Sequence, residues 1–236
     1  MYSFESRVRY SEVDSSRRLS IAGIVNYFQD CSNFHSEDRN LGIDYVTDHH
    51  MMWVINFWQI KVERRPIMGE MIRICTQVHE MRGFMAQRNF CLLDAEGKTL
   101  VRANSIWTLI DTDKSRPANV TQEMLEGYEI CEKLDMDYAP RKIRVPEAGE
   151  QQEPILITHA HLDTNHHVNN GQYVTLAMHY LPDDFEIGEL RAEYRRQVFL
   201  GDTMYPAISR SEDGTFFVSM NDAEGKPYAV VSFIRK

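Results

Sequence analysis

The chain has 236 residues, of which 43% are hydrophobic, and its formal net charge is −9. This composition is typical of a globular protein, and the acidic balance argues against a nucleic-acid partner. No apolar run approaches the roughly 18 residues of a membrane-spanning helix, and residues 1–7 lack the apolar core of a secretory signal. Four cysteines without metal or redox spacing fit reduced thiols, so we expect a cytoplasmic protein.

The first half of the chain predicts one long helix and a run of antiparallel strands. Residues 4–10 predict a short strand, and after a polar loop Ser20 can cap a helix from about Ile21 to His35. Its apolar residues recur at helical spacing: Ile21, Ile24, Val25, Phe28, Cys31 and Phe34. Alternating or β-branched runs predict strands at 53–62, 71–78, 86–93 and 100–110. A helix followed by hairpin-connected strands indicates an α+β fold with an antiparallel sheet.

The second half repeats this order of elements. A helix from Asn170 to about Tyr180 is followed by predicted strands at 190–199, 204–210, 216–220 and 229–234. Residues 94–98 recur unchanged as 222–226, in the hairpin loop of each half. Arg64-Arg65 also recurs as Arg195-Arg196, offset by one residue relative to the following turn. We therefore predict two copies of one helix-plus-sheet unit, at 1–116 and 153–236, and a linker at 117–152 with a short helix at 121–134.

One stretch just before the helix of the second copy gathers groups with catalytic chemistry. Asp163, Asn165 and His167 stand at alternate positions, and alternate residues of an extended segment point the same way. Asn169 and Asn170 are the expected helix start, where backbone N–H groups can stabilise a developing negative charge. An acid, an amide, a base and such a helix start within ten residues predict a hydrolytic site. The alternative is an ordinary capped helix after a polar loop.

The corresponding loop of the first copy, residues 12–18, differs in its chemistry. Ser16 stands in the place of Asn165 and Arg18 in that of His167, so only the second copy keeps the acid, the amide and the base. Zinc is a further alternative for the second copy, because four histidines crowd together: His159, His161, His166 and His167. Neither a nearby cysteine pair nor a His-Glu-x-x-His motif accompanies them, so we expect no metal and no cofactor.

Three features of the sequence resemble the acyl-acyl-carrier-protein thioesterases of plants and bacteria. They are Leu162-Asp163-x-Asn165-x-His167-Val168-Asn169-Asn170-x-x-Tyr173, then Glu193-Tyr194-Arg195-Arg196 before a Gly201-Asp202 turn, and the loop and helix from Asp14 to Phe28. The resemblance covers nearly the whole chain and implies two tandem hotdog folds, each a sheet wrapped around a long helix. It implies hydrolysis of fatty acyl-acyl-carrier-protein thioesters, which releases free fatty acid and ends chain elongation in fatty acid biosynthesis. Acyl carrier protein is the implied partner, and a homodimer is left open.

The resemblance implies that Asp163, Asn165 and His167 are catalytic. Plant members carry a Glu-Cys pair where this chain has Gln197 and Val198. Valine cannot be a nucleophile and glutamine cannot be a general base, although its amide can hold a water molecule. We therefore expect water to attack the thioester, with His167 as the base because imidazole changes charge near neutral pH. Asp163 would orient the base, while Asn165 and Gln197 position water or the acyl carbonyl.

The acyl chain and its carrier need further sites. By resemblance, the chain lies in the first copy, with these candidates for its slot: Ile24, Phe28, Trp53, Ile55, Phe57 and Trp107. Plain core packing is the alternative for each of them. Carrier proteins are acidic, so a basic patch should receive them, with these candidates: Arg141, Lys142, Arg144, Arg195 and Arg196. Ordinary solvated surface charge is the alternative for these residues.

Two other functions fit the same fold. Hotdog proteins include hydroxyacyl dehydratases, which use a histidine and an acid on the central helix, and this chain offers His35, Glu37 and Asp38 at the end of that helix. A non-catalytic acyl-binding protein is the third reading, favoured by Gln197. The sequence alone does not decide the chain-length preference, the oligomeric state or the choice between carrier protein and coenzyme A.

Overall fold

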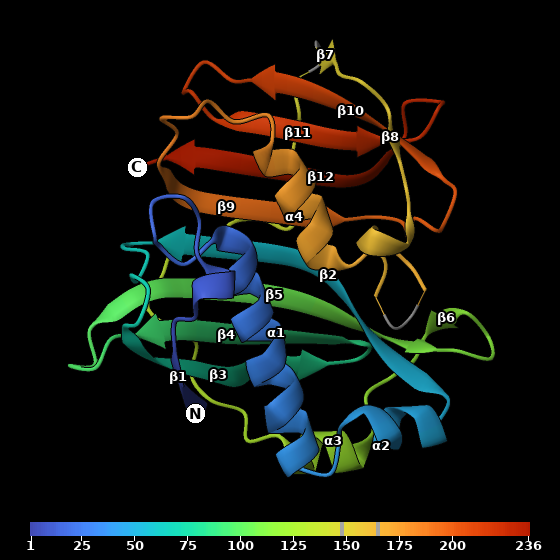
Figure 1. Ribbon diagram of the computed structural model, residues 1–236. Helices are drawn as coiled ribbons and strands as arrows, with labels where there is room; N and C mark the ends of the chain where they lie inside the picture. Colours follow the sequence, from blue (N-terminus) through green and yellow to red (C-terminus); the bar gives the residue numbers. More distant parts are fainter. Residues whose placement is uncertain (147–148, 164–165) are drawn as a thin grey trace. The chain divides into compact units, whose positions relative to one another are not determined.

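The chain divides into two units, Met1–Ala139 and Pro140–Lys236, in the computed structural model. The structure describes residues 1–146, 149–163 and 166–236. Each unit contains a run of antiparallel strands and one main helix, α1 or α4 (Figure 1). Among the described residues no helix is long and apolar enough to cross a membrane.

Helix α1 (Ile21–Asp38) organises the first unit. It begins where the sequence predicts, because the Ser20 side chain accepts a hydrogen bond from the Gly23 N–H at 3.0 Å. Its predicted apolar face is buried except for Phe34, which is 45% exposed. The short helix α2 (Ile43–Asp48), which the sequence does not predict, follows it. The N-cap residue of α2, Gly42, has no side chain that could cap the helix. The Glu37 carboxylate takes this role and accepts the Ile43 N–H at 2.9 Å.

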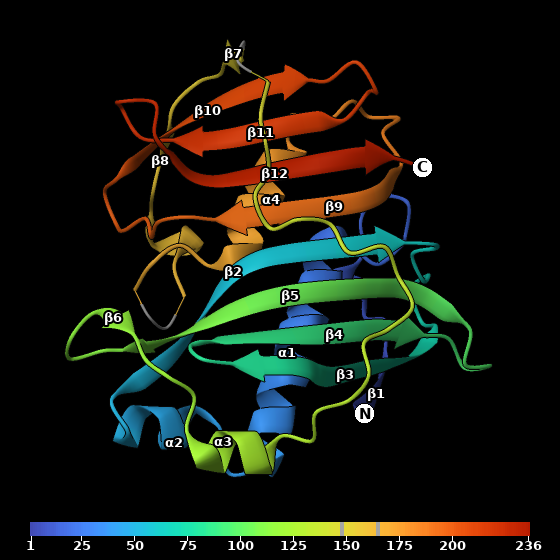
Figure 2. The same cartoon turned by 180° about the vertical axis from the view of Figure 1, so that it is seen from behind.

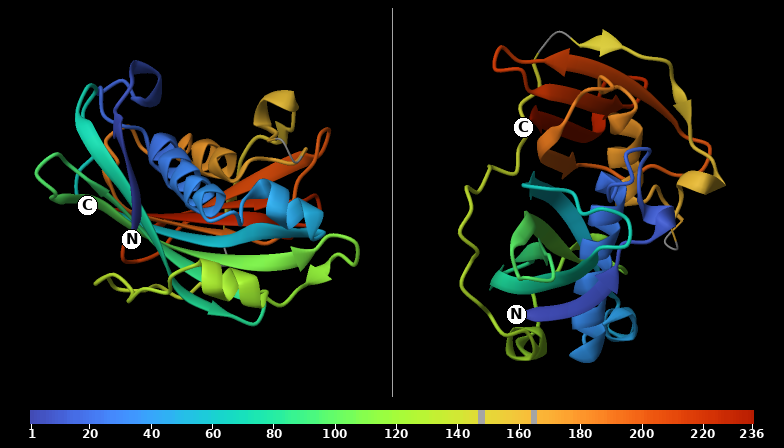
Figure 3. Two further views of the ribbon diagram at one scale, coloured as in Figure 1. Left: turned by 90° about the horizontal axis from the view of Figure 1, so that it is seen from below. Right: turned by 60° about the vertical axis from the view of Figure 1, so that its left-hand side comes forward.

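The sheet of the first unit has the strand order β1-β3-β4-β5-β2, and β6 pairs with β5. Its strands are β1 (Tyr2–Arg7), β2 (Met51–Val62), β3 (Met71–Arg82), β4 (Met85–Leu93), β5 (Thr99–Asp111) and β6 (Arg116–Pro117). Helix α1 lies across one face of this sheet (Figures 1 and 3). There Phe28 packs on Trp58 and Phe90, with ring centroids 6.1 and 5.1 Å apart. This contact forms the centre of the apolar core.

The opposite face of that sheet carries the segment 128–139, which we call the strap (Figure 2). Helix α3 (Gln122–Gly127), capped by Thr121, precedes it. The predicted helix at 121–134 is therefore wrong in its second half. Backbone N–H groups of the strap donate to buried amide side chains of the sheet instead. Asn89 accepts the Leu134 N–H at 3.0 Å, and Gln59 accepts the Ala139 N–H at 2.8 Å. These tertiary partners replace the intrahelical hydrogen bonds of this segment.

The second unit repeats the arrangement around α4 (Asn170–Met178). Its sheet has the order β9-β12-β11-β10-β7, and β8 also pairs with β10. The strands are β7 (Glu150–Gln151), β8 (Ile155–Leu156), β9 (Ile187–Tyr194), β10 (Thr203–Arg210), β11 (Phe216–Asn221) and β12 (Pro227–Arg235). The predicted strand at 190–199 ends at Tyr194. The N–H groups of Arg195 and Arg196 both approach the Tyr228 carbonyl, at 2.8 and 3.1 Å, so the chain leaves the ladder there.

The hairpin loops of the two units confirm the repeat. In each, an aspartate accepts the backbone N–H groups two and four residues later: Asp94 at 3.1 and 2.8 Å, Asp222 at 3.0 and 2.8 Å. The predicted one-residue offset of the arginine pairs is confirmed. Arg64 lies 3.7 Å from Asp94, and Arg196 bonds Asp222 at 2.7 Å, so these two arginines correspond. Gln197 is therefore the counterpart of Arg65.

Candidate active site

Residues 162–163 and 166–168 form the two ends of a turn and do not continue as the extended segment that the alternation predicts. Leu162 and Val168 pair in an antiparallel bridge, and the Asp163 N–H donates to the His167 carbonyl at 3.0 Å. His166 has a φ of 62°, the left-handed conformation that closes the turn. Asp163 and His167 thus meet by a reversal of the chain. Asn165, the third predicted catalytic residue, lies outside the described residues.

The two nitrogen atoms of the His167 ring have different surroundings. Nδ1 lies 3.7 Å from Asp163 Oδ2 and 3.4 Å from the Val168 carbonyl oxygen, and both neighbours are acceptors. The proton of a neutral imidazole therefore belongs on Nδ1, which leaves the lone pair on Nε2. Nε2 is buried and has no hydrogen-bond partner among the described residues. The side chains are 15% exposed for His167 and 18% exposed for Asp163.

Helix α4 begins directly after this turn. Asn169 is its N-cap and accepts the Gly171 N–H on its side chain at 2.8 Å. The partly buried Tyr194 hydroxyl donates to the Asn170 carbonyl at 2.9 Å and ties the helix start to β9. Burial raises the pKa of Tyr194, so this donor stays protonated. The first turn of the helix, with its backbone N–H groups, therefore lies within three residues of His167 in the chain.

Residues 197–199 run beside the turn. The Val168 N–H donates to the Val198 carbonyl at 2.9 Å, and His167 pairs with Phe199 in an antiparallel bridge. Val198 is fully buried, whereas Gln197 is exposed and lies beyond the end of β9. The expectation that Gln197 continues a strand face is therefore wrong, although the residue is adjacent to the turn that holds His167.

The first unit contains the same turn with other side chains. The Asp14 N–H donates to the Arg18 carbonyl at 2.9 Å, and Arg17 has a φ of 59°. Arg65, the counterpart of Gln197, makes an ion pair with Asp14. Burial acts to raise the pKa of Asp14, but hydrogen bonds from Ser16 and Arg65 outweigh it and lower that pKa. This turn holds a carboxylate neutralised by arginine and contains no imidazole.

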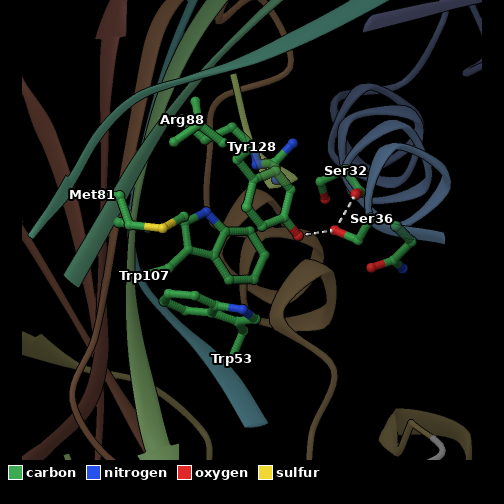
Figure 4. Close-up of a pocket in the computed structure, with 10 residues that line it drawn as sticks. Ser32, Ser36, Trp53, Met81, Arg88, Trp107 and Tyr128 are labelled. Carbon is green, nitrogen blue, oxygen red and sulfur yellow. Dashed lines mark hydrogen bonds between the residues drawn. The ribbon is translucent and has the colours of Figure 1, made fainter. Parts of the chain in front are cut away.

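A pocket in the first unit, which we call the first-unit pocket, includes two of the six predicted acyl-slot residues, Trp53 and Trp107 (Figure 4). The other four are at most 2% exposed in the core: Ile24, Phe28, Ile55 and Phe57. Further apolar lining comes from Val78, Met81 and Ala86, and polar lining from Ser32, Asn33, Ser36, Arg88 and Tyr128. Sequence reasoning missed Arg88 and Tyr128. The alternation of β4 was a usable signal, because it places Arg88 on the same face as Phe90.

The predicted carrier-protein patch divides into two groups of exposed basic residues. Arg195 pairs with Glu193 at 2.9 Å, and Arg196 pairs with Asp222 and stacks 4.4 Å from the centre of the Tyr228 ring. The ion pairs found in the described part of the chain include none of Arg141, Lys142 and Arg144. These three are exposed and flank the buried Ile143, whose N–H donates to Glu193 at 2.9 Å.

The residues that suggested a dehydratase have structural partners. His35 is 4% exposed, stacks on Tyr2 at 5.1 Å and accepts a hydrogen bond from Arg88 at 3.0 Å. Glu37 caps α2, and Asp38 accepts the Tyr2 hydroxyl at 2.8 Å. Across residues 1–146, 149–163 and 166–236, no cluster of three or more His, Cys, Asp or Glu side chains has the geometry of a metal site.

Comparison with known proteins gives consistent matches. The acyl-ACP thioesterase N-terminal domain matches residues 1–128, and the acyl-ACP thioesterase C-terminal domain matches residues 147–230. A chloroplastic acyl-[acyl-carrier-protein] hydrolase of Cuphea viscosissima is 27% identical over 206 residues, which cover 80% of this chain and 50% of that protein. The chain spans about half the length of the curated relatives it matches.

Two solved structures share the fold. An acyl-ACP thioesterase from Bacteroides thetaiotaomicron has a TM-score of 0.91 and 20% identity, and the match covers 99% of this chain and 97% of that one. The 12:0-ACP thioesterase from Umbellularia californica has a TM-score of 0.85 and 21% identity, covering 100% of this chain and 96% of that one. The predicted α+β tandem hotdog fold is therefore confirmed.

Proposed function

Because this chain belongs to the acyl-acyl-carrier-protein thioesterase family, we propose that it hydrolyses fatty acyl-acyl-carrier-protein thioesters and releases free fatty acid. Such a reaction ends chain elongation in fatty acid biosynthesis. The observation that carries the proposal is the state of His167. Its Nδ1 faces acceptors that hold the proton, and its buried Nε2 is left as the basic atom. An acid–imidazole pair of this kind is the usual arrangement of a general base.

The proposed reaction needs no covalent intermediate. His167 Nε2 takes a proton from water as the water oxygen attacks the thioester carbon, and Asp163 stabilises the imidazolium that forms. The tetrahedral intermediate then breaks its carbon–sulfur bond. The imidazolium returns the proton to the leaving thiolate, so fatty acid and free carrier thiol are the products. Asn165 and Gln197 are proposed to position the water or the carbonyl.

The start of α4 is the proposed oxyanion site. Asn169 fixes the N-terminal turn through its side-chain bond to the Gly171 N–H. Backbone N–H groups at a helix start, including that of Asn170, are oriented before the reaction and so stabilise negative charge without rearrangement. The same residues would cap any helix, so the proposal rests on their closeness in the chain to His167.

The substrate would use two further surfaces. We assign the acyl chain to the first-unit pocket with Trp53 and Trp107. We assign the acidic carrier protein to the exposed group Arg141, Lys142 and Arg144, which among the described residues lacks ion pairs like those of Arg195 and Arg196. A cytoplasmic location fits the four unpaired cysteines. A homodimer is a further proposal, and we assign no surface of the chain to its interface.

One assay separates this function from its rivals. The purified chain is mixed with saturated and with 3-hydroxyacyl carrier-protein thioesters of equal length, and the products are analysed by mass spectrometry. Free fatty acid supports hydrolysis. An enoyl product would identify a dehydratase, and binding without turnover would identify a non-catalytic acyl-binding protein. The same acyl chains on coenzyme A show whether the carrier protein itself is recognised.

Gln197 provides a test at the position where the family has glutamate. If it holds a water molecule, Gln197→Ala should lower kcat by about 10-fold, which corresponds to one positioning hydrogen bond of about 1.4 kcal/mol. Gln197→Glu should keep or raise kcat, because a carboxylate accepts the same hydrogen bond. It should also move the acidic limb of the pH profile of kcat, since a second titrating group then lies beside His167.

The measurement is kcat against pH for wild type and both variants on one acyl thioester. Gln151, an exposed glutamine on β7, provides the matched control through Gln151→Glu and Gln151→Ala. Three superimposable profiles for residue 197 would show that its side chain takes no part in the reaction.

No cysteine is expected to be essential, because Val198 fills the place of the family's cysteine. Cys31, Cys75 and Cys91 are buried in the first unit, and Cys131 belongs to the strap. Each single Cys→Ala variant should keep kcat, per folded molecule, in the same range as wild type. Activity and melting temperature are measured together, because burial makes a loss of stability the ordinary cost of these changes. Loss of kcat in a variant that melts normally would instead indicate a covalent route through that thiol.

A further inference from the structure

The first-unit pocket contains a buried cation. Arg88 lines the pocket and is 7% exposed. Figure 4 shows Arg88 and Trp53 at opposite ends of the set of labelled side chains, with Tyr128 and Trp107 between them. The pocket therefore combines an apolar part, formed by Trp53, Trp107 and their aliphatic neighbours, with one permanently charged group.

The partners of Arg88 supply no negative charge. Its Nη1 donates to His35 Nδ1 at 3.0 Å and, at 3.4 Å, to the Thr76 hydroxyl. Its guanidinium carbon lies 5.4 Å from the centre of the Tyr128 ring. Burial and the nearby arginine lower the pKa of His35 to about 4, so this imidazole is neutral at pH 7. The ion pairs found among the described residues do not include Arg88.

The neighbourhood holds the guanidinium in place for a ligand. The Tyr128 hydroxyl lies 2.6 Å from that of Ser36, which itself donates to the Ser32 carbonyl at 3.0 Å, and this chain fixes the ring against Arg88. Asp38 accepts the Tyr2 hydroxyl instead of pairing with Arg88. A guanidinium has five N–H donors, more than its hydrogen bonds to His35, Thr76 and Tyr128 use among the described residues. A buried cation without a counter-ion is costly, and an anion entering the pocket would remove that cost.

We propose that this pocket selects acyl chains whose far end carries an anionic group, with a terminal carboxylate held by Arg88 and the methylene chain lying against Trp53 and Trp107. The substrate class is then the thioesters of α,ω-dicarboxylic acids. The inference rests on the proposed thioesterase function for the identity of the reaction, but the binding preference itself is independent of hydrolysis. Hydrolysis of such a half-thioester gives the free diacid and the thiol.

The test measures binding by tryptophan fluorescence, because two of the three tryptophans line the pocket. The full chain carries His167→Ala, so that the ligands are not consumed. Three N-acetylcysteamine thioesters of equal chain length serve as probes: octanoyl, the half-thioester of octanedioic acid, and the methyl ester of that half-thioester. The first and third have neutral tails. We expect the carboxylated probe to bind at least about 10-fold more tightly than either neutral probe.

Arg88→Met keeps the length of the side chain and removes its charge. It should abolish the preference for the carboxylated probe while the octanoyl probe binds at least as tightly as before, and Arg88→Lys should keep part of the preference. Circular dichroism melting checks that each variant is folded. If the chain with Arg88 intact binds the three probes with equal affinity, that result alone overturns the inference. A preference that survives Arg88→Met in a folded protein also overturns it.

Turnover by the chain with His167 intact, with the octanoyl and carboxylated probes prepared as acyl-carrier-protein thioesters, separates the two proposals. Hydrolysis of the octanoyl and carboxylated probes at equal kcat/KM, with equal affinities, contradicts the inference and leaves the proposed hydrolysis standing. Tighter binding of the carboxylated probe without hydrolysis of either contradicts the proposed hydrolysis and supports the pocket preference.

Discussion

His167→Ala is expected to lower kcat at least about 10²-fold, the usual contribution of a positioned general base. In the proposed reaction the imidazole acts on the proton of the attacking water in the transition state, so KM should change much less than kcat. The structural reason is that the two ring nitrogens of His167 have different surroundings. Nδ1 lies 3.7 Å from Asp163 Oδ2, and Nε2 is buried and has no hydrogen-bond partner among the described residues. The measurement is steady-state kinetics on one acyl-carrier-protein thioester, with a melting curve for each variant.

His159 is the matched control, because it is an exposed histidine in the 3-10 turn just before the site. His159→Ala should leave both kcat and KM at wild-type values. A His167→Ala protein that melts normally and turns over at nearly the wild-type rate would remove His167 from the mechanism. The exposed Gln197 would then be the residue to examine next.

Asn89→Ala should cost about 2–4 kcal/mol of unfolding free energy, because it leaves buried polar groups without their partner. The Asn89 carboxamide is fully buried. Its oxygen accepts the Leu134 N–H at 3.0 Å and the Tyr138 hydroxyl at 2.9 Å, and its nitrogen donates to the Ala103 carbonyl at 3.2 Å. No other side chain bonds the strap at both Leu134 and Tyr138 among the described residues.

The measurement is urea denaturation together with amide hydrogen exchange of the strap. Gln87 is on the same strand but bonds Glu80 at the surface, so Gln87→Ala should stay within about 0.5 kcal/mol of wild type. Exchange at the Leu134 N–H should become faster in Asn89→Ala and stay slow in the control. Unchanged stability and unchanged protection of Leu134 would show that the strap is held by its other contacts.

The regular elements were predictable because local signals and tertiary packing agree in them. Ser20 caps α1 where the apolar period begins, and the Asp94 and Asp222 loops repeat to the residue. The end of α3 was not predictable, since the competing hydrogen bonds come from amides on distant strands. Helix periodicity carries no information about such partners.

The site was predictable in its residues but not in its conformation. The alternate positions of Asp163 and His167 predicted an extended segment, whereas His166 has the left-handed backbone conformation of a turn. Nothing in the sequence around a histidine predicts that conformation, which few residues other than glycine adopt. Arg88 was overlooked although the alternation of β4 places it on the same face as Phe90. A charged residue in an alternating strand is normally assigned to solvent, and the contacts of Arg88 with His35 of α1 and with Tyr128 show that its face is the inner one.

The matching turns of the two units have a consequence for how such a protein can evolve after a gene duplication. Arg17 and His166 share one backbone conformation, and in both turns the aspartate N–H closes onto the carbonyl four residues later. One copy can therefore have an arginine where the other has a histidine and keep the same backbone, because the turn is closed by main-chain hydrogen bonds and not by these side chains. After a duplication, each unit can therefore acquire its own side chains on the same backbone. Here the second unit carries the proposed base, His167, and the first unit carries the tryptophan-lined pocket.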